Sequence, residues 1–89
     1  MNVVAFKAAA EPLSRQVAVY CVQAYWRDRQ GLARGKFQQF GSMEAALRAG
    51  RVASAKAAGV SVYVVRGYVG TDVWSEPRVI ATHGQVPEG

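Results

Sequence analysis

The chain has 89 residues, 51% of them hydrophobic and 19% charged, which is typical of one small globular domain and excludes a largely disordered chain. Its single cysteine excludes an intramolecular disulfide and a cysteine-built zinc site, and no segment is long and apolar enough to span a membrane. The formal net charge of +5 would suit nucleic acid, acidic proteins or anionic surfaces as partners, and equally a charge that serves solubility alone.

Residues 1–15 are expected to be a poorly ordered lead-in, because Pro12 discourages a helix from continuing through it. The apolar stretch at the start is interrupted by Lys7 and does not match a signal peptide. Small secreted domains usually depend on disulfides. The sequence therefore predicts a cytoplasmic protein with a single domain over residues 16–87.

Residues 17–26 are rich in β-branched and aromatic types, which favour a strand. Both alternating faces of this segment are largely apolar, which is typical of a central strand. A polar loop is expected over residues 27–35, followed by a short strand over residues 36–40 that completes a hairpin. In this second strand, Phe37 and Gln39 share one face.

A helix is expected over residues 42–58. Ser42 can cap its first turn, and Gly59 can close its far end in the left-handed conformation. Gly50 costs about 1 kcal/mol relative to alanine inside a helix, so either the site merely tolerates it or the helix approaches a sheet closely. Small and apolar residues occupy one face at helical spacing, namely Met43, Ala46, Leu47, Gly50, Ala53 and Ala57.

Residues 60–69 read as a third strand, followed by a turn at 70–72 and a short return stretch at 73–74. Residues 79–82 read as a short edge strand. With so few elements, the stable arrangement is a mainly antiparallel sheet of three to four strands with the helix packed on one face. The predicted class is α+β, in the order strand, strand, helix, strand, strand.

Residue types that could carry catalysis are sparse. The only histidine, His83, is expected to have an exposed structural role near a strand end. Cys21 lies among apolar residues, where burial raises its pKa, so a buried hydrophobe is favoured over a nucleophile paired with His83. The acidic residues are scattered, and no glycine loop suited to phosphate is present. The sequence predicts no enzyme, no metal and no cofactor.

Residues 25–40 combine cations with aromatic rings, which is the combination that single-stranded nucleic acid requires. A hairpin tip of this kind could also enter a groove of duplex DNA. Arginines in loops usually point into water, and aromatics beside a hairpin usually belong to the core. The candidate residues for nucleic-acid binding are Trp26, Arg27, Arg29, Arg34 and Lys36.

A second candidate surface follows from the predicted fold. If the helix covers one face of the sheet, the other face keeps apolar side chains from the first strand, and exposed apolar patches usually mark contacts. Tyr63, Tyr68 and Trp74 on the later strands would belong to this surface. The sequence therefore favours a binding domain for a protein partner or a second copy, with nucleic-acid binding as the alternative.

The order of a basic hairpin, an alanine-rich helix and a valine-rich strand resembles small uncharacterised bacterial proteins over residues 16–87. The residues that carry this resemblance are Lys36, Phe37, Phe40, Ser42 to Ala46, Gly59, Val60 and Val62 to Val65. That resemblance implies a fold and no activity. Residues 34–58 are also similar to phage-integrase arm-binding domains, which implies a sheet that enters the DNA major groove. The chain departs from those domains by continuing into residues 60–69.

Overall fold

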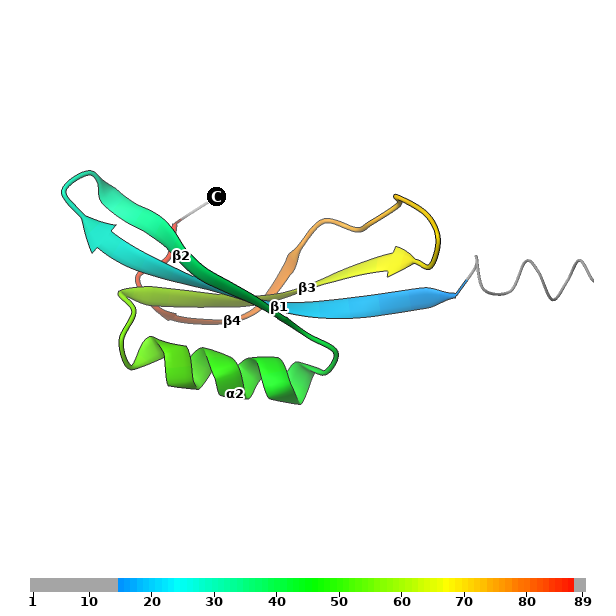
Figure 1. The fold of residues 1–89 in the computed structure, drawn as a ribbon, viewed down its shortest axis with the longest axis horizontal. Helices are drawn as coiled ribbons and strands as arrows, with labels where there is room; N and C mark the ends of the chain where they lie inside the picture. Colours follow the sequence, from blue (N-terminus) through cyan, green and yellow to red (C-terminus); the bar gives the residue numbers. More distant parts are fainter. Residues whose placement is uncertain (1–14, 88–89) are drawn as a thin grey trace, which may run out of the picture.

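One helix lies across one face of an antiparallel sheet, and the two ends of the sheet extend beyond it (Figure 1). The computed structural model describes residues 15–87, so the lead-in expected over residues 1–15 lies, apart from Arg15, outside the described residues. The α+β class, the element order and the position of the helix are confirmed. The elements are β1 (Gln16–Asp28), β2 (Gly31–Phe40), α2 (Met43–Ser54), β3 (Gly59–Tyr68) and β4 (Arg78–Gly84).

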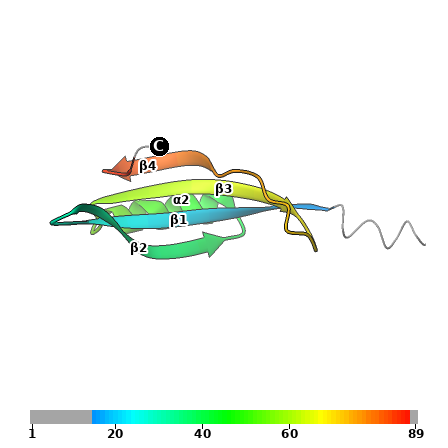
Figure 2. The same ribbon diagram turned by 90° about the horizontal axis from the view of Figure 1, so that it is seen from above.

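The sheet has the strand order β2-β1-β3-β4, with β1 and β3 in the middle and the helix behind them when seen from above (Figure 2). The central position predicted for the first strand is confirmed. Tyr20 of β1, for example, pairs with Phe40 on one side and Val64 on the other. Neighbouring strands satisfy the backbone of β1 on both edges, and α2 covers one of its two faces.

The hairpin between β1 and β2 is tighter than expected, and the prediction of a polar loop over residues 27–35 is wrong. The turn consists of Arg29 and Gln30, and pairing resumes at once between Asp28 and Gly31. A carboxylate oxygen of Asp28 accepts a hydrogen bond from the backbone of Gln30 at 2.8 Å, and Gly31 adopts a φ of 123° that side chains disfavour. This local turn chemistry lets the strand begin five residues before the predicted residue 36.

A bulge interrupts this hairpin between Gln23 and Tyr25 of β1. The buried side-chain amide of Gln23 donates hydrogen bonds to the backbone carbonyls of Ala24 at 2.9 Å and Gly35 at 3.1 Å. Carbonyls released from the regular ladder are thereby satisfied inside the protein. The bulge keeps Arg34 and Phe37 on the same side of the sheet although three positions separate them.

The helix begins as predicted, with the hydroxyl of Ser42 accepting from the backbone N–H of Ala45 at 3.2 Å. It ends at Ser54, so its expected extent to residue 58 is wrong. The expected closure by Gly59 is also wrong, because Gly59 has no left-handed φ and is the first residue of β3. A turn follows the helix instead, and Ala58 then donates to the carbonyl of Tyr25 at 2.9 Å. That bond starts the pairing of β3 with β1.

The core lies between α2 and the sheet and is built from Val22, Ala46, Val60 and Val62, with Leu47 packed against it. A Cβ at Gly50 would lie 2.7 Å from a methyl carbon of Val62, which confirms the close approach inferred from that glycine. Met43 was expected on the buried stripe but is 48% exposed. Helical side chains tilt toward the N-terminus, so the first residue points past the start of the helix rather than onto the sheet.

The segment between β3 and β4, residues 69–77, rises on the side of the sheet opposite the helix (Figure 1). The return stretch expected at residues 73–74 is a single bridge between Trp74 and Gly67. Ser75 fastens the segment, because its backbone N–H donates to the carbonyl of Arg66 and its hydroxyl accepts from the N–H of Arg66. The edge position predicted for the last strand is confirmed.

Candidate functional site

The face of the sheet opposite α2, called the open face below, is covered by no helix or strand of residues 15–87. Residues that pair across antiparallel strands point to the same side, so the strand register identifies its members. They are Val17, Val19, Cys21, Gln23, Tyr25, Arg27, Leu32, Arg34, Phe37, Gln39, Ser61, Tyr63, Val65, Gly67, Val79 and Thr82.

The exposed side chains of the open face include two large hydrophobic residues beside the polar Arg34, Gln39 and Thr82, and its half-buried members are apolar or aromatic. Phe37 is 46% exposed and Val79 is 58% exposed, although both are large hydrophobic residues. Trp74, also exposed, lies on the same side, because a Cβ on Gly67 would point from the open face into the indole ring. An apolar surface shared by all four strands is the feature of this molecule that most resembles a contact surface.

A shallow hollow of about 430 Å³ opens on this face beside the hairpin. Arg34 contributes a cation to the hollow, and three aromatic rings and one amide contribute the remainder of its lining. The lining residues are Gln23, Tyr25, Arg34, Phe37 and Tyr63. Such a hollow can receive a planar or apolar group that also interacts with a guanidinium.

Cys21 is 2% exposed and lies beneath the side chains of the open face. Burial raises the pKa of its thiol, and the neighbouring side chains of Tyr63 and Gln39 act in the opposite direction. Burial also raises the pKa of the Tyr63 hydroxyl, as does the adjacent Cys21. Both groups are therefore neutral at physiological pH, and the thiol is a weak nucleophile there.

His83 lies on the other side of the sheet from Cys21, because its register partner is Val60 of the helix-covered face. The two residues cannot act as a nucleophile and its base in this arrangement. His83 is half-buried rather than exposed as expected. The reason is Gly50, where an added Cβ would lie 3.9 Å from the imidazole, so the glycine leaves room for the ring beside α2.

The residues predicted to bind nucleic acid divide between the two faces. Arg27 and Arg34 stand at open-face positions, and Arg29 lies in the exposed turn. Lys36 and Trp26 instead line a groove on the helix side. The Nε of Arg27 donates to the side-chain oxygen of Gln85 at 3.0 Å, which fastens the hairpin to the segment after β4.

The residues predicted to form an interaction surface also divide. Tyr63 and Trp74 lie on the open face, whereas Tyr68 pairs with Gln16 at a register position of the helix side, beyond the helix itself. Sequence reasoning missed Phe37 and Val79 as members of the surface. Their alternation with polar neighbours was visible, but only the register shows which face the helix leaves uncovered.

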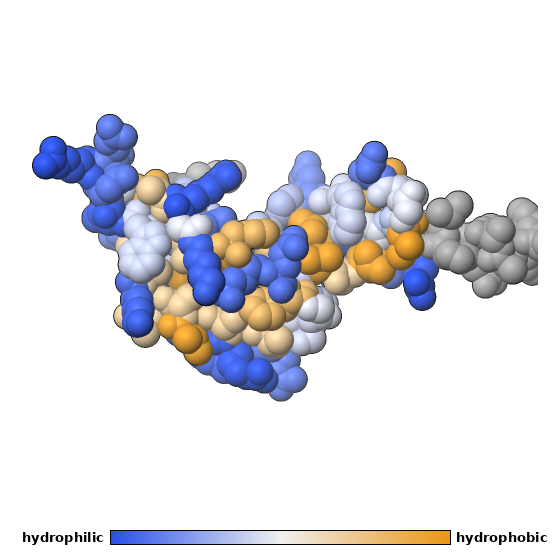
Figure 3. Space-filling model, in the orientation of Figure 1, coloured by the Kyte–Doolittle hydropathy of each residue, from blue (hydrophilic) through white to orange (hydrophobic). Residues whose placement is uncertain are grey.

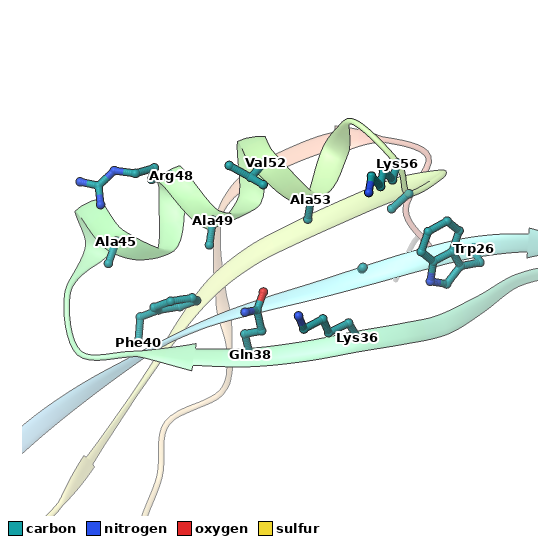
Figure 4. A pocket seen from close by; sticks show the side chains of 12 residues that line it. Trp26, Lys36, Gln38, Phe40, Ala45, Arg48, Ala49, Val52, Ala53 and Lys56 are labelled. Carbon is teal, nitrogen blue, oxygen red and sulfur yellow. The ribbon is translucent and has the colours of Figure 1, made fainter.

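A groove of about 540 Å³ lies on the opposite side of the molecule, between α2 and β2 (Figure 4). Along this side hydrophobic residues between the sheet and the helix are interspersed with hydrophilic ones, and hydrophilic side chains gather at the hairpin end (Figure 3). Its strand wall carries Lys36, Gln38 and Phe40, and its helix wall is mostly alanine. The molecule therefore has two concave surfaces on opposite sides of one sheet.

Comparison of the chain with known protein families, curated proteins and solved structures finds no match. The two resemblances described from the sequence therefore stay predictions. Within residues 15–87, no three His, Cys, Asp or Glu side chains are grouped as a metal site would require. The helix of this part of the chain is too short and too polar to cross a membrane. The open face and the groove between α2 and β2 are therefore the candidate functional surfaces of the described residues.

Proposed function

We propose that the protein is a non-enzymatic binding domain that self-associates, with two copies packing their open faces together about a twofold axis. The observation that carries this proposal is the apolar open face, to which all four strands contribute and on which Phe37 and Val79 are exposed. Packing two such faces would bury these side chains as in a sandwich of two sheets. A twofold axis lets one self-complementary surface serve both copies.

The charges at the two ends of the sheet support a second copy as the partner. The hairpin end carries Arg27, Arg29 and Arg34, whereas the segment at the far end carries Asp72 and Glu76. Both ends rise on the open side (Figure 1). When the twofold axis lies in the interface and perpendicular to the strands, the hairpin of each copy meets the far end of the other. Opposite charges then face each other, which favours this arrangement over one in which the two hairpins meet.

The cations nearest the acidic end do not cancel this pattern. Arg66 pairs with Ala18, and Arg78 pairs with Val64, so both stand at helix-side positions of the register. Arg15, which precedes the helix-side Gln16 and accepts a hydrogen bond from the backbone of Val69, is the one described cation of that end on the open side, beside the two acids Asp72 and Glu76. The asymmetry between the two ends persists on the surface that would form the contact.

Nucleic-acid binding is the second candidate, and one observation favours it. Arg34 shares its hollow with the rings of Tyr25, Phe37 and Tyr63, which would combine phosphate or base contact with stacking. Base stacking on an aromatic ring contributes about 1–3 kcal/mol. The contact would use the same open face as the dimer, so the two functions would compete for it.

Sedimentation velocity over a range of protein concentrations tests self-association. We expect a monomer–dimer equilibrium in the micromolar range, and Phe37→Glu should abolish the dimer because it places a charge in an apolar contact. Met43→Glu is the matched control, since Met43 is 48% exposed against 46% for Phe37 but lies at the start of α2, away from the open face. A wild-type chain that stays monomeric at all concentrations would contradict the proposal.

Reversing the charges tests the orientation of the two copies. In one variant Arg29 and Arg34 become glutamate, so both ends are acidic; in the other Asp72 and Glu76 become arginine, so both ends are basic. Each variant alone should dimerise at least about tenfold more weakly, because like charges meet. An equimolar mixture should regain dimers, because every hairpin then meets an opposite charge. If mixing restores nothing, the twofold arrangement is wrong.

Salt separates the two candidate functions. The apolar dimer should weaken only modestly as salt rises, because its centre carries few charges. Oligonucleotide binding should fall by powers of ten over the same range, since phosphate contacts release counterions. A monomer that binds single strands with this steep dependence, and loses them in the Arg29→Glu, Arg34→Glu variant, would replace self-association with nucleic-acid binding.

A further inference from the structure

The groove between α2 and β2 exists because the helix side chains on that side are too short to reach the strand. The helix lies nearest β1 and β3, and toward β2 it presents four alanines spaced four residues apart. One methyl group at each position leaves a channel of about 540 Å³, which is within the usual size of ligand sites. The alanines are Ala45, Ala49, Ala53 and Ala57.

Aromatic rings mark the two ends of the groove. Trp26 lies at the end near Lys56, and Phe40 lies at the end near Ala45 (Figure 4). The indole packs over Gly35, where any Cβ would collide with the ring, so the backbone of β2 holds Trp26 in place. The helical rise of 1.5 Å per residue gives the helical part of the channel a length of about 12 Å between Ala45 and Ala53.

Two of the three cations that line the groove come from the half near Trp26. Lys36 on β2 and Lys56 just after α2 stand there on opposite walls, and the ammonium group of Lys36 points toward Gln38 (Figure 4). The guanidinium of Arg48 extends toward the beginning of α2, away from both lysines. None of the described residues that line the groove is acidic. Two cations in one half of a long apolar channel match a ligand with one anionic head and an aliphatic tail.

We infer that this groove binds a linear aliphatic carboxylate. The carboxylate lies between the ammonium groups of Lys36 and Lys56, and the chain runs over the alanines toward Phe40. The groove lies on the side of the sheet opposite the open face, so this site is independent of the proposed dimer.

The two tryptophans of the chain allow the site to be observed directly. Trp74 lies on the open face, so in a Trp74→Phe variant Trp26 is the only source of indole fluorescence. Titration with dodecanoate below its micellar concentration should give a saturable change in Trp26 emission, with an affinity in the micromolar range. Dodecanol should bind at least about tenfold more weakly, because it lacks the charge that the lysines hold.

Three variants in this background locate the ligand. Lys36→Met with Lys56→Met should weaken dodecanoate about tenfold while preserving the apolar stems and leaving dodecanol unchanged. The matched control changes Arg51 and Arg66 to methionine, two exposed cations that do not line the groove. Ala49→Leu should block the channel, and thermal unfolding establishes that this variant is folded.

The inference is overturned if Trp26 emission shows no saturable change, or if the lysine variant binds dodecanoate as tightly as the control does. Equal affinities for dodecanoate and dodecanol would likewise reject the anionic head site. Each titration is repeated in Phe37→Glu, which removes the proposed dimer contact. Phe37→Glu should bind dodecanoate as the wild type does, because the groove lies on the other side of the sheet. A wild type that binds dodecanoate but stays monomeric would reject only self-association, and a wild type that dimerises without binding dodecanoate would reject only the groove.

Discussion

At the scale of single residues, the open face contains two ionisable groups that the fold keeps neutral. Cys21 and Tyr63 are register partners on β1 and β3, and burial raises the pKa of both. The thiol is covered by its neighbours, whereas the ring of Tyr63 is half-buried and helps to line the hollow beside Arg34. The folded sheet is therefore stabilised when both groups keep their protons, and neither group is suited to acid–base chemistry.

Stability should consequently fall in alkaline solution. The folded state holds both protons more tightly than the unfolded chain, in which ordinary thiol and phenol pKa values are about 8.5 and 10. The contribution of the two groups is complete below those values and is lost as pH rises through the raised ones. Urea unfolding should show a decreasing free energy above about pH 8.5. A Cys21→Ala, Tyr63→Phe variant should show a shallower decrease, and an unchanged slope would contradict this assignment.

At the scale of elements, the packing of α2 on the sheet depends on one missing side chain. Gly50 is buried directly above Val62, and no larger residue fits without a shift of the valine. The same contact leaves room for His83 beside the helix and sets the distance between α2 and the sheet. This distance between helix and sheet, together with the short alanine side chains of the helix, leaves the groove beside β2 open.

Gly50→Ala tests this contact against helix propensity. Propensity alone would stabilise the helix by about 1 kcal/mol, whereas overpacking a core costs about 1–3 kcal/mol. We expect a net loss of about 1 kcal/mol in chemical unfolding. Gly41→Ala is the control, because an added Cβ there meets open space. Val62→Ala should lower the free energy of unfolding less in the Gly50→Ala background than in the wild type, because it removes the side chain that the added methyl group overlaps. A gain in stability for Gly50→Ala would reject close packing.

At the scale of the whole molecule, the described residues form a single layer of sheet with one helix, which covers one side of it. The core is small, and its largest fully buried side chains are valines, Val22, Val60 and Val62. A domain of this size buries a limited fraction of its surface alone. Pairing two open faces would add a second apolar layer, so self-association would also raise the stability of the fold.

Thermal unfolding should therefore depend on protein concentration. If the dimer unfolds to separate chains, each tenfold increase in concentration raises Tm by about 3–5 °C. Phe37→Glu should unfold at a lower Tm that does not change with concentration, whereas Met43→Glu should behave as the wild type does. Calorimetry over a hundredfold range of concentration measures both effects. A wild-type Tm that is independent of concentration would contradict a coupling of stability to self-association.

Local chemistry in the sequence determined the number, order and class of the elements. The β-branched run of β1, the Ser42 cap and the small residues of α2 each act within a few neighbouring residues, so their patterns were readable without coordinates. The early end of the helix could not be predicted in this way, because it is accompanied by a bond from Ala58 to the distant Tyr25. The turn at Arg29 and Gln30 is closed by a local bond to Asp28, so its signal was present in the sequence although a longer loop was predicted.

The tertiary structure alone decided which side chains share a surface. Pairing of β1 with β2 and β3 places Arg34, Phe37 and Tyr63 together and sends Trp26 and Lys36 to the other side. A sequence with alternating faces contains both sets, but a shift of one residue in register would exchange them. Register is fixed by a bulge, a two-residue turn and contacts between distant segments. The pairings of β1 with β2 and β3, rather than residue type, therefore decide which side chains lie on the open face and which line the groove.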